Sequence, residues 1–187
     1  LEECKILADK SGGEGFFSPG TGNSKGVGII INKKLNFVLE KSSKDYDGRV
    51  VMVDCRINGF MVRLLCIYAP NISPDRRNFL NEVLPLYLVT SRKIIMAGDF
   101  NFVENVLLDK TGSDRGATCG RIELSDLKMV HLLTDPFRKL YPDKIAYSHS
   151  NGTMFSRLDR FYVSNSLLNS VSDVKHTPCS MSDHYYV

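Results

Sequence analysis

The stretch Ile94-Ile95-Met96-Ala97-Gly98-Asp99-Phe100-Asn101 decides how the fold is interpreted. Its apolar part is too short for a helix and contains β-branched residues, which predicts a buried strand that ends at Gly98. Asp99 and Asn101 follow two residues apart, so in an extended chain their side chains point to the same side. In this arrangement Asp99 could accept or donate a proton, and Asn101 could act as a neutral hydrogen-bond donor, beside the same reacting centre. The alternative is an Asx turn after a strand, because Gly, Asp and Asn also dominate turns.

Composition and charge favour a globular domain. The chain has 187 residues, of which 43% are hydrophobic and 24% charged, which suffices for one domain with a core and argues against disorder. The net charge of +3 is compatible with a polyanionic partner and equally with an ordinary basic surface. No apolar run in the sequence approaches membrane-spanning length, so we expect no membrane partner.

The cysteines indicate the redox state of the protein. Their number is five, and no two have Cys-x-x-Cys spacing. Cys55 and Cys66 lie within apolar, strand-like runs. This pattern favours reduced, buried thiols of an intracellular protein over a disulfide framework or a zinc site.

The periodicity predicts antiparallel strands interrupted by helices. Residues 1–25 are rich in glycine and are predicted to be mostly loop, and residues 102–120 form a long polar loop. Ser73 is the expected N-cap of the first helix, which Pro85 must kink or end. Strands are predicted at residues 26–31, 37–39, 49–57, 60–69, 93–98, 146–150, 156–164 and 182–187. Helices are predicted at residues 73–84, 122–133, 137–141 and 165–171. The first four strands read as one meander, and the whole as an α+β layered domain.

A second stretch, Ile67-Tyr68-Ala69-Pro70-Asn71, places a tyrosine at the end of a predicted strand, because Pro70 cannot continue the ladder. The hydroxyl of Tyr68 can donate a hydrogen bond to an anionic oxygen. The alternative is a strand-end tyrosine half-buried in the core, which is the commoner case.

A third stretch, Ser156 to Val163, alternates two sets of side chains along a strand. If Phe161 and Val163 face inward, then Asp159 does too. A buried carboxylate needs a partner. The alternative is a solvated ion pair of Asp159 with a neighbouring arginine, Arg157 or Arg160.

A fourth stretch, Ser182-Asp183-His184, combines an acid with an imidazole. Adjacent residues on a strand point to opposite faces, so the two side chains do not simply pair with each other. One can take a metal ion while the other takes a proton. A buried Asp159 that hydrogen-bonds His184 would fix the tautomer of the imidazole. The alternative is a polar turn before a strand.

Taken together and in this order, the four stretches resemble the endonuclease/exonuclease/phosphatase superfamily, which has the deoxyribonuclease I-like fold. The flanking residues look most like the endonuclease domain of non-LTR (LINE-type) retrotransposons. The stretches that carry this closer resemblance are Phe16-Phe17-Ser18, Ser24-Lys25-Gly26-Val27, Leu107-Leu108-Asp109-Lys110 and Arg160-Phe161-Tyr162-Val163-Ser164. The resemblance implies a single α+β domain over residues 1–187, a four-layer sandwich of two mostly antiparallel β-sheets flanked by helices.

The resemblance also implies Mg²⁺-dependent hydrolysis of phosphodiesters. Asp99 would orient or deprotonate the attacking water, Asn101 would hold a phosphate oxygen, and Tyr68 would contact the scissile phosphate. Asp159 would orient His184, and His184 would stabilise the charged phosphorane.

Further site residues follow from the same resemblance. Asp183 would be a carboxylate on the metal side, and Asn71, Ser148 and Ser182 would contact the substrate. Ser148 stands where the family usually has a threonine, and His149 departs from the aromatic residue that commonly follows it.

One departure concerns the metal. The family begins with two further strands that carry an Asn and then a Glu in a Gln-Glu-Thr context, and that Glu is the principal metal ligand. Nothing in the sequence matches it, since Glu2 and Glu3 stand in Leu-Glu-Glu-Cys. The last strand also stops short. We therefore expect a domain that lacks its first strands, exposes an unpaired strand edge, and by itself binds Mg²⁺ weakly and cleaves slowly.

By this resemblance the chain would nick DNA in the nucleus, so that a reverse transcriptase domain downstream in the same polypeptide can prime from the free 3′-hydroxyl. Two alternatives remain open. One is a phosphatase of the same fold that acts on inositol lipids or nucleotides. The other is a noncatalytic, DNA-binding remnant of a decayed retroelement.

Overall fold

The elements of the protein fall into two compact units in the computed structural model, which describes residues 2–20, 25–112 and 119–187, with side chains from residue 6 onward. The first unit comprises Leu1–Tyr68 and Thr90–Met96, and the second comprises Ala69–Val89 and Ala97–Val187. Ser24 and residues 113–118 of the predicted polar loop lie outside the described residues. The expectation of one domain over residues 1–187 stays a prediction.

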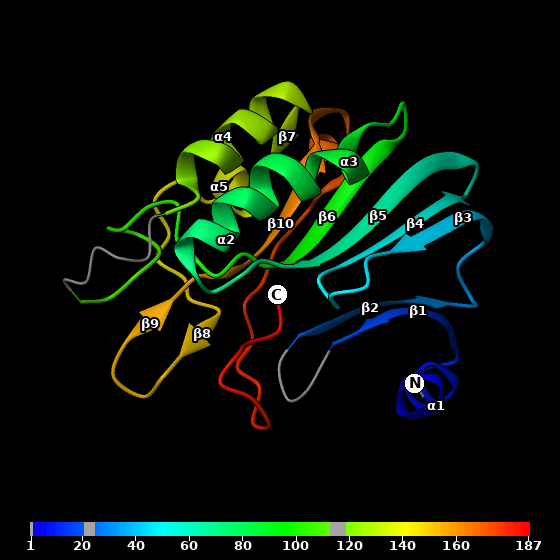
Figure 1. Cartoon of the computed structure of the whole chain (residues 1–187), viewed down its shortest axis with the longest axis horizontal. Coiled ribbons are helices and arrows are strands. Elements are labelled where there is room, and N and C mark those ends of the chain that lie inside the picture. Colours follow the sequence, from blue (N-terminus) through cyan, green and yellow to red (C-terminus); the bar gives the residue numbers. More distant parts are fainter. Residues whose placement is uncertain (1, 21–24, 113–118) are drawn as a thin grey trace. The chain divides into compact units, whose positions relative to one another are not determined.

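A helix and a hairpin form the start of the first unit, where the sequence predicts loop. Helix α1 (Glu2–Lys10) contacts β1 (Gly13–Pro19), which pairs antiparallel with β2 (Gly26–Asn32) (Figure 1). A Cβ atom at Gly15 would lie 2.3 Å from the ring of Phe17, and one at Gly28 would lie 2.5 Å from it. These glycines therefore make room for an aromatic ring inside a hairpin. The prediction of loop for residues 1–25 was wrong at Gly15, which it read as a turn residue, whereas the predicted strand at residues 26–31, which contains Gly28, is confirmed as β2.

The rest of the first unit is a sheet in which β3, β4, β5 and β6 are neighbours in that order. Asn58 (φ 50°) and Gly59 (φ 85°) form the tight turn between β4 and β5, as their dipeptide predicts. The predicted meander is confirmed for β3 to β5 but is wrong for β2, which pairs with β1 instead. The bounds of these four strands are β3 (Phe37–Lys44), β4 (Val50–Ile57), β5 (Phe60–Tyr68) and β6 (Lys93–Asp99).

Strand β4 supplies the core of the first unit. Its residues from Val50 to Cys55 are all buried, and Asp54 among them accepts two 2.7 Å hydrogen bonds from the guanidinium of Arg63. Cys55 is a free thiol whose pKa burial raises. Cys66 is also free, although half-buried. Both cysteines are reduced, as their apolar surroundings predict.

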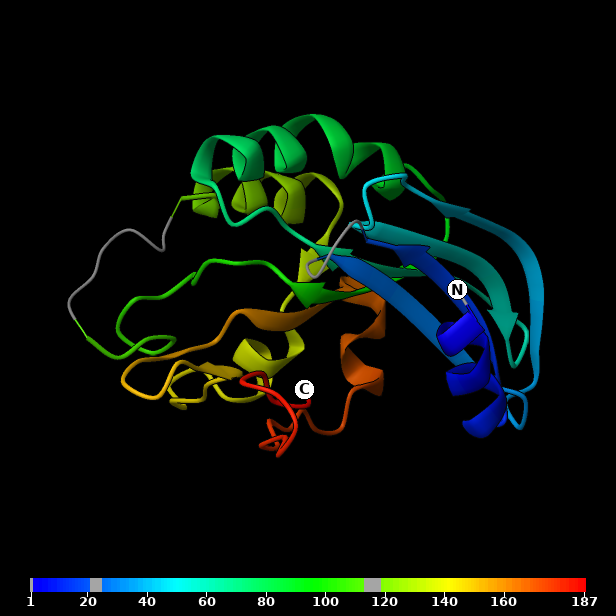
Figure 2. The ribbon, with the colours of Figure 1, turned by 60° about the horizontal axis from the view of Figure 1, so that its bottom comes forward.

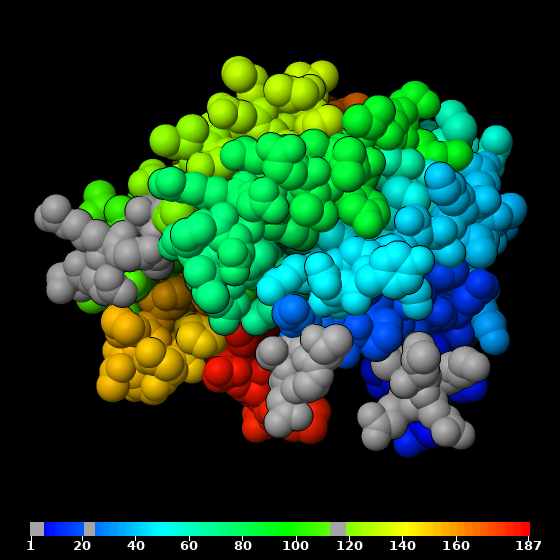
Figure 3. All heavy atoms as spheres, in the orientation of Figure 1, coloured from blue at the N-terminus to red at the C-terminus, as the bar shows by residue number. Residues whose placement is uncertain are grey.

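In the second unit a broken helix packs beside α4. Ile72 occupies the N-cap position expected for Ser73, and Pro74 lies in the first turn. A π-helical turn precedes Pro85, which begins a new helix, so the predicted break is confirmed. Arg77 lies 3.4 Å from Glu123 of α4, and the two helical segments lie side by side in Figures 2 and 3. The elements are α2 (Ser73–Asn78), η1 (Phe79–Val83), α3 (Pro85–Leu88) and α4 (Arg121–Val130).

The remaining elements of the second unit are short. Strand β10 pairs antiparallel with β7, and β8 pairs with β9 across the segment that contains Asn151 and Gly152. The predicted last strand at residues 182–187 is wrong, because the segment makes only isolated bridges such as His149 to His184. The elements are β7 (Leu133–Thr134), α5 (Pro136–Leu140), β8 (His149–Ser150), β9 (Phe155–Ser156), β10 (Asp159–Ser164) and the 3₁₀ helix η3 (Asn165–Ser170).

The sequence considered an inward face of β10 made of Asp159, Phe161 and Val163, but the structure buries Val163 together with Arg160 and Tyr162. Arg160 and Tyr162 are 1% and 0% exposed, whereas Asp159 and Phe161 are half-buried. The guanidinium of Arg160 lies 4.9 Å from the ring of Phe100 and donates to the carbonyl oxygen of Phe102 at 2.8 Å. A stacked and hydrogen-bonded arginine can therefore occupy a core position. No helix in the described part of the chain is long and apolar enough to cross a membrane.

Candidate active site

The end of β6 places Asp99 in a sharp change of chain direction. Gly98 (φ 147°) and Asn101 (φ 56°) both have positive φ, which glycine and asparagine tolerate better than other residues. Oδ1 of Asp99 accepts the backbone N–H of Asn101 at 2.8 Å. The Asx turn considered as the alternative is therefore present, and it is part of the site.

The same turn directs Asn101 away from the extended geometry that the sequence predicts. Its carboxamide nitrogen donates to the carbonyl oxygen of Ala69 at 2.7 Å, and the N–H of Ala69 donates to the carbonyl oxygen of Asp99 at 2.8 Å. The expectation that the Asp99 and Asn101 side chains share one side of an extended strand was wrong, because Asn101 is left-handed. Asn101 instead ties the end of β6 to the segment before α2.

Asp159 and His184 make the contact that the sequence suggests. Nδ1 of His184 lies 2.8 Å from Oδ2 of Asp159. Neither arginine that flanks Asp159 is its partner: Arg157 pairs with Asp109 and Asp135, and Arg160 lies 3.8 Å from Glu104. The surface ion pair considered as the alternative is therefore wrong. The carboxylate orients the imidazole and favours the tautomer with its proton on Nδ1.

Ser148 lies beneath this pair. It is fully buried, and its hydroxyl donates to Oδ2 of Asp159 at 2.7 Å while accepting the N–H groups of Leu158 and Asp159 at 2.9 and 2.8 Å. The side chain thus positions Asp159. Because Ser148 is fully buried in this conformation, its hydroxyl does not reach a substrate as expected.

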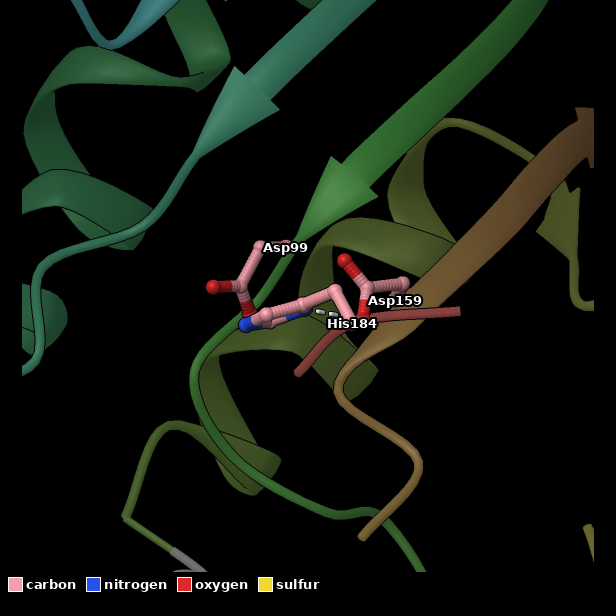
Figure 4. Close-up of side chains that lie close together, drawn as sticks. All are labelled: Asp99, Asp159 and His184. Carbon is pink, nitrogen blue, oxygen red and sulfur yellow. Dashed lines mark hydrogen bonds and ion pairs between the residues drawn. The ribbon is translucent and has the colours of Figure 1, made fainter. Parts of the chain in front are cut away.

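Asp99, Asp159 and His184 come together as a triad (Figure 4). One ligand atom from each residue lies within 4.8 Å of the other two. Asp99 comes from β6, Asp159 from β10, and His184 from the C-terminal segment. Figure 4 shows the imidazole between the two carboxylates, with its bond to Asp159 on one side and Asp99 on the other.

The surroundings of the triad raise the pKa values of two of its members, Asp99 and His184. Burial, and secondarily the charge of Asp159, raises the pKa of Asp99 to about 6. The hydrogen bond that His184 donates to Asp159 is the main cause that raises the pKa of His184 above its ordinary value of 6.5. The site thus holds a carboxylate that is more basic than an ordinary aspartate and an imidazole that keeps its proton to a higher pH than usual.

Asp183 and Ser182 lie next to this triad in the chain. The side chain of Asp183 is 65% exposed, and its Oδ2 lies 3.5 Å from Nε2 of His149. The hydroxyl of Ser182 accepts the N–H of His184 at 3.0 Å. Within the described residues Asp183 is not a member of the triad, so its metal-binding role and the substrate contact of Ser182 stay predictions.

Tyr68 and Asn71 are described at separate places. Tyr68 belongs to the first unit, where its carbonyl oxygen accepts from Arg49 at 3.1 Å and its ring lies 5.5 Å from the guanidinium of Arg49. Asn71 is an exposed residue of the second unit, and Nη1 of the buried Arg76 donates to its carbonyl oxygen at 2.8 Å. The expected phosphate contacts of both residues stay predictions.

A buried ion network next to Ser156 was missed by the sequence analysis. Nε of Arg157 donates to Asp109 at 2.8 Å, and its Nη1 donates to Asp135 at 2.7 Å. Arg138 also donates to Asp109 at 2.5 Å. The available signal was the position of Asp135 before Pro136, which is typical of an N-cap, since Asp135 accepts the N–H of Phe137. The network fixes the residue two positions before Asp159.

Comparison with known proteins identifies the family. The model of the Endonuclease/Exonuclease/phosphatase family matches residues 4–184. The chain belongs to the Endonuclease/Exonuclease/phosphatase family. This result agrees with the resemblance of the four sequence stretches.

A protein of similar sequence comes from a transposon. The chain is 25% identical over 179 residues to a protein named "Transposon TX1 uncharacterized 149 kDa protein" from Xenopus laevis. The match covers 92% of this chain and 14% of that protein, so the chain spans about a seventh of the relative's length.

Solved structures of similar fold are nucleases and phosphatases by their names. An AP endonuclease from Leishmania major has a TM-score of 0.78 at 20% identity, covering 99% of this chain and 73% of its own. A 3′ phosphatase from Neisseria, bound to a product DNA hairpin, has a TM-score of 0.76 at 19% identity, covering 96% and 79%. These likenesses show the fold, a deoxyribonuclease I-like α/β sandwich, and confirm the α+β prediction.

The carboxylates at this site are chemically suited to bind a divalent metal ion. Carboxylate oxygens are the ligands that Mg²⁺ prefers, and Mg²⁺ is often bound by one or two protein carboxylates, with water and substrate phosphate completing its shell. Asp183 offers an exposed carboxylate next to the triad. Oδ2 of Asp159 is less suited, because it already accepts from Ser148 and contacts His184.

Proposed function

We propose that the chain is the DNA-nicking endonuclease domain of a retrotransposon polyprotein and hydrolyses phosphodiesters with Mg²⁺. The observation that carries the proposal is the triad, in which the His184–Asp159 bond of 2.8 Å lies beside an Asp99 carboxyl whose pKa is raised to about 6. The family and the transposon protein from Xenopus laevis support it.

The first role is that of a general base. A carboxylate with a pKa of about 6 is mostly ionised at pH 7, yet it accepts a proton more readily than an ordinary aspartate. Asp99 would take the proton of the attacking water. Asn101 would hold the turn that aims Asp99, because its own backbone N–H donates to the carboxylate, and its carboxamide would reach a phosphate oxygen with its second hydrogen.

The second role is charge stabilisation. With Nδ1 bonded to Asp159, the imidazolium of His184 has its Nε2–H left to donate to a nonbridging or leaving oxygen of the phosphate. Ser148 and the Arg157 network hold Asp159 in place for this task. A bound Mg²⁺, held through Asp183, would supply electrostatic stabilisation of the phosphate charge.

The biological setting is part of the same proposal. The nick would be made in nuclear DNA, and a reverse transcriptase domain of the same polypeptide would extend the 3′-hydroxyl. The large size of the transposon relative supports a polypeptide with further domains.

A plasmid assay tests the function. We expect the protein with Mg²⁺ to convert supercoiled plasmid slowly to nicked circles over hours, and Asp99→Asn and His184→Ala to lose nearly all of this activity. Asp126→Asn, which changes an exposed acid of α4, is the matched control and should retain it. Equal nicking by the wild type and both site variants would contradict the proposal.

A phosphatase activity is the second candidate, favoured by the likeness to the Neisseria 3′ phosphatase. The same proteins are therefore given a DNA duplex with a 3′-phosphate at an internal nick. Release of inorganic phosphate without plasmid nicking would replace the endonuclease by a phosphatase. DNA binding without either reaction would support the noncatalytic alternative.

A further inference from the structure

Arg76 of α2 is a buried cation whose hydrogen-bond partners are uncharged. The residue is 2% exposed, and its guanidinium lies 5.7 Å from the centroid of the Phe102 ring. Burial lowers the pKa of the guanidinium, so a charge in this position is unfavourable by itself. Its acceptors among the described residues are the carbonyl oxygens of Pro70 (2.9 Å), Asn71 (2.8 Å) and Cys119 (2.8 Å) and the hydroxyl of Ser73 (3.2 Å). None of these groups is a carboxylate, so the arginine acts on the backbone that it binds and not through an ion pair.

Two of these acceptors lie directly after Ala69, the residue to which the turn of the proposed general base is tied. The N–H of Ala69 donates to the carbonyl oxygen of Asp99 at 2.8 Å, and the carbonyl oxygen of Ala69 accepts from the carboxamide of Asn101 at 2.7 Å. Nη1 of Arg76 binds the carbonyl oxygens of residues 70–71, the next two along the chain. The guanidinium therefore fixes the segment that holds both ends of the turn from Asp99 to Asn101.

We propose that Arg76 is a positioning residue for Asp99, which it holds in place through residues 69–71. The inference deepens the proposed function, on which it rests, because it names the group that keeps the general base in place. Oδ1 of Asp99 accepts the N–H of Asn101 at 2.8 Å, so the carboxylate moves when the turn moves. Burial lowers the pKa of Arg76, and the negative charge of Asp99 is among the groups that oppose this effect, so the two charges attract each other.

The geometry of the contacts requires a guanidinium. Nε of Arg76 binds the carbonyl oxygen of Cys119 while Nη1 binds residues 70–71, so one planar group joins two segments that are far apart in the sequence. The single ammonium nitrogen of a lysine keeps the charge, but it has neither the fork of donors nor the flat face that lies over Phe102. Arg76→Lys should therefore loosen residues 69–71 without removing the positive charge.

Carbon-13 NMR titration of the Asp99 carboxyl in the whole protein, with EDTA and without DNA, tests the position of this carboxylate apart from any activity. The wild type should titrate at about 6, and in Arg76→Lys the pKa of Asp99 should fall by at least about 0.5 toward 3.8, because burial is the main cause of the raised value. Arg63→Lys is the matched control, since Arg63 is also buried and binds Asp54 with its guanidinium. It should lower the urea concentration at half-unfolding and leave the pKa of Asp99 unchanged.

Chemical rescue gives a second readout. Arg76→Ala leaves space for a guanidinium ion, so methylguanidinium in the buffer should return the pKa of Asp99 toward its wild-type value, whereas methylammonium at the same concentration should not. In nicking assays with Mg²⁺, Arg76→Lys should lower kcat about 10- to 100-fold and leave KM within about twofold, since a small misplacement of a catalytic group has an effect of this size.

Any of four results would overturn the proposal: an Asp99 pKa in Arg76→Lys equal to that of the wild type, a fall of the same size in Arg63→Lys, equal rescue by the two cations, or failure of both Arg76 variants to fold. The last would show that the arginine serves the fold as a whole. A shifted pKa in Arg76→Lys, beside a wild type that does not nick DNA, would reject the proposed function alone. A wild type that nicks DNA, beside an Arg76→Lys with unchanged pKa and rate, would reject this inference alone.

Discussion

Replacing Asp99 with asparagine is expected to stabilise the protein while it removes activity. The folded protein raises the pKa of this carboxyl from its ordinary value of 3.8 to about 6, mainly by burial. A difference of about two pKa units, at 1.36 kcal/mol each, corresponds to about 3 kcal/mol that the ionised group costs the folded state. Asparagine has nearly the same shape, and its carbonyl oxygen can still accept the N–H of Asn101. The variant should thus escape the cost of the charge without losing the turn.

The pH dependence of this effect identifies its cause. Below about pH 4 the carboxyl is neutral in both the folded and the unfolded states, so Asp99→Asn should unfold at the same urea concentration as the wild type. Between pH 4 and pH 6 the unfolded state loses its proton first, and the advantage of the variant should grow. Above about pH 6 it should level off at up to about 3 kcal/mol.

Urea unfolding of both proteins, followed by circular dichroism from pH 4 to pH 8 with EDTA present, measures this difference. The same preparation should lose about 10²- to 10⁴-fold in nicking rate with Mg²⁺, the usual contribution of a general base. Asp126→Asn, at an exposed position, should change neither quantity. A gain in stability that is constant across the pH range, or absent at pH 8, would refute the argument that burial of the ionised Asp99 carboxylate destabilises the folded state.

The other predictions concern the supports of the triad. Arg157→Leu leaves the buried Asp109 without a main partner, so the free energy of unfolding should fall by about 3–5 kcal/mol in urea titration; a change below 1 kcal/mol would contradict the buried network. Ser148→Ala leaves two buried N–H groups without their acceptor and should cost about 1–3 kcal/mol, with a lower His184 pKa measured by NMR titration. The nicking rate should rise with pH through about 6 as Asp99 ionises and fall again at a pH above 6.5 as His184 loses its proton. A rate that is flat from pH 5 to pH 9 would exclude both assignments.

The parts of the fold that the sequence predicts are those that local chemistry determines. Asn58 and Gly59 have the positive φ angles that their turn needs, and Pro85 interrupts its helix as any proline must. The contact of His184 with Asp159 could also be inferred, because a carboxylate on a buried strand needs a hydrogen-bond partner and an imidazole can supply one. These inferences require no knowledge of what packs against the segment.

The errors arise where distant residues determine the outcome. Gly15 reads as loop until the ring of Phe17 is known to lie against it. Arg160 reads as a surface residue until Phe100 and Phe102 provide aromatic faces and a carbonyl oxygen for its guanidinium. In each case a residue with a strong local preference is placed by tertiary contacts that no periodicity reveals.

The C-terminal segment shows both the success and the failure of prediction from local sequence. The predicted last strand does not form, and His184 nevertheless contacts Asp159. No strand ladder carries the histidine; isolated bridges, the bond from Tyr185 to Ser148 and the contact with Asp159 do so instead. A residue held by few contacts is positioned only as well as each of them allows. The fully buried hydroxyl of Ser148 acquires its importance in this way, since it fixes the carboxylate on which the orientation of His184 depends. The precision of the proposed active site thus rests on a serine that touches neither water nor substrate in this conformation.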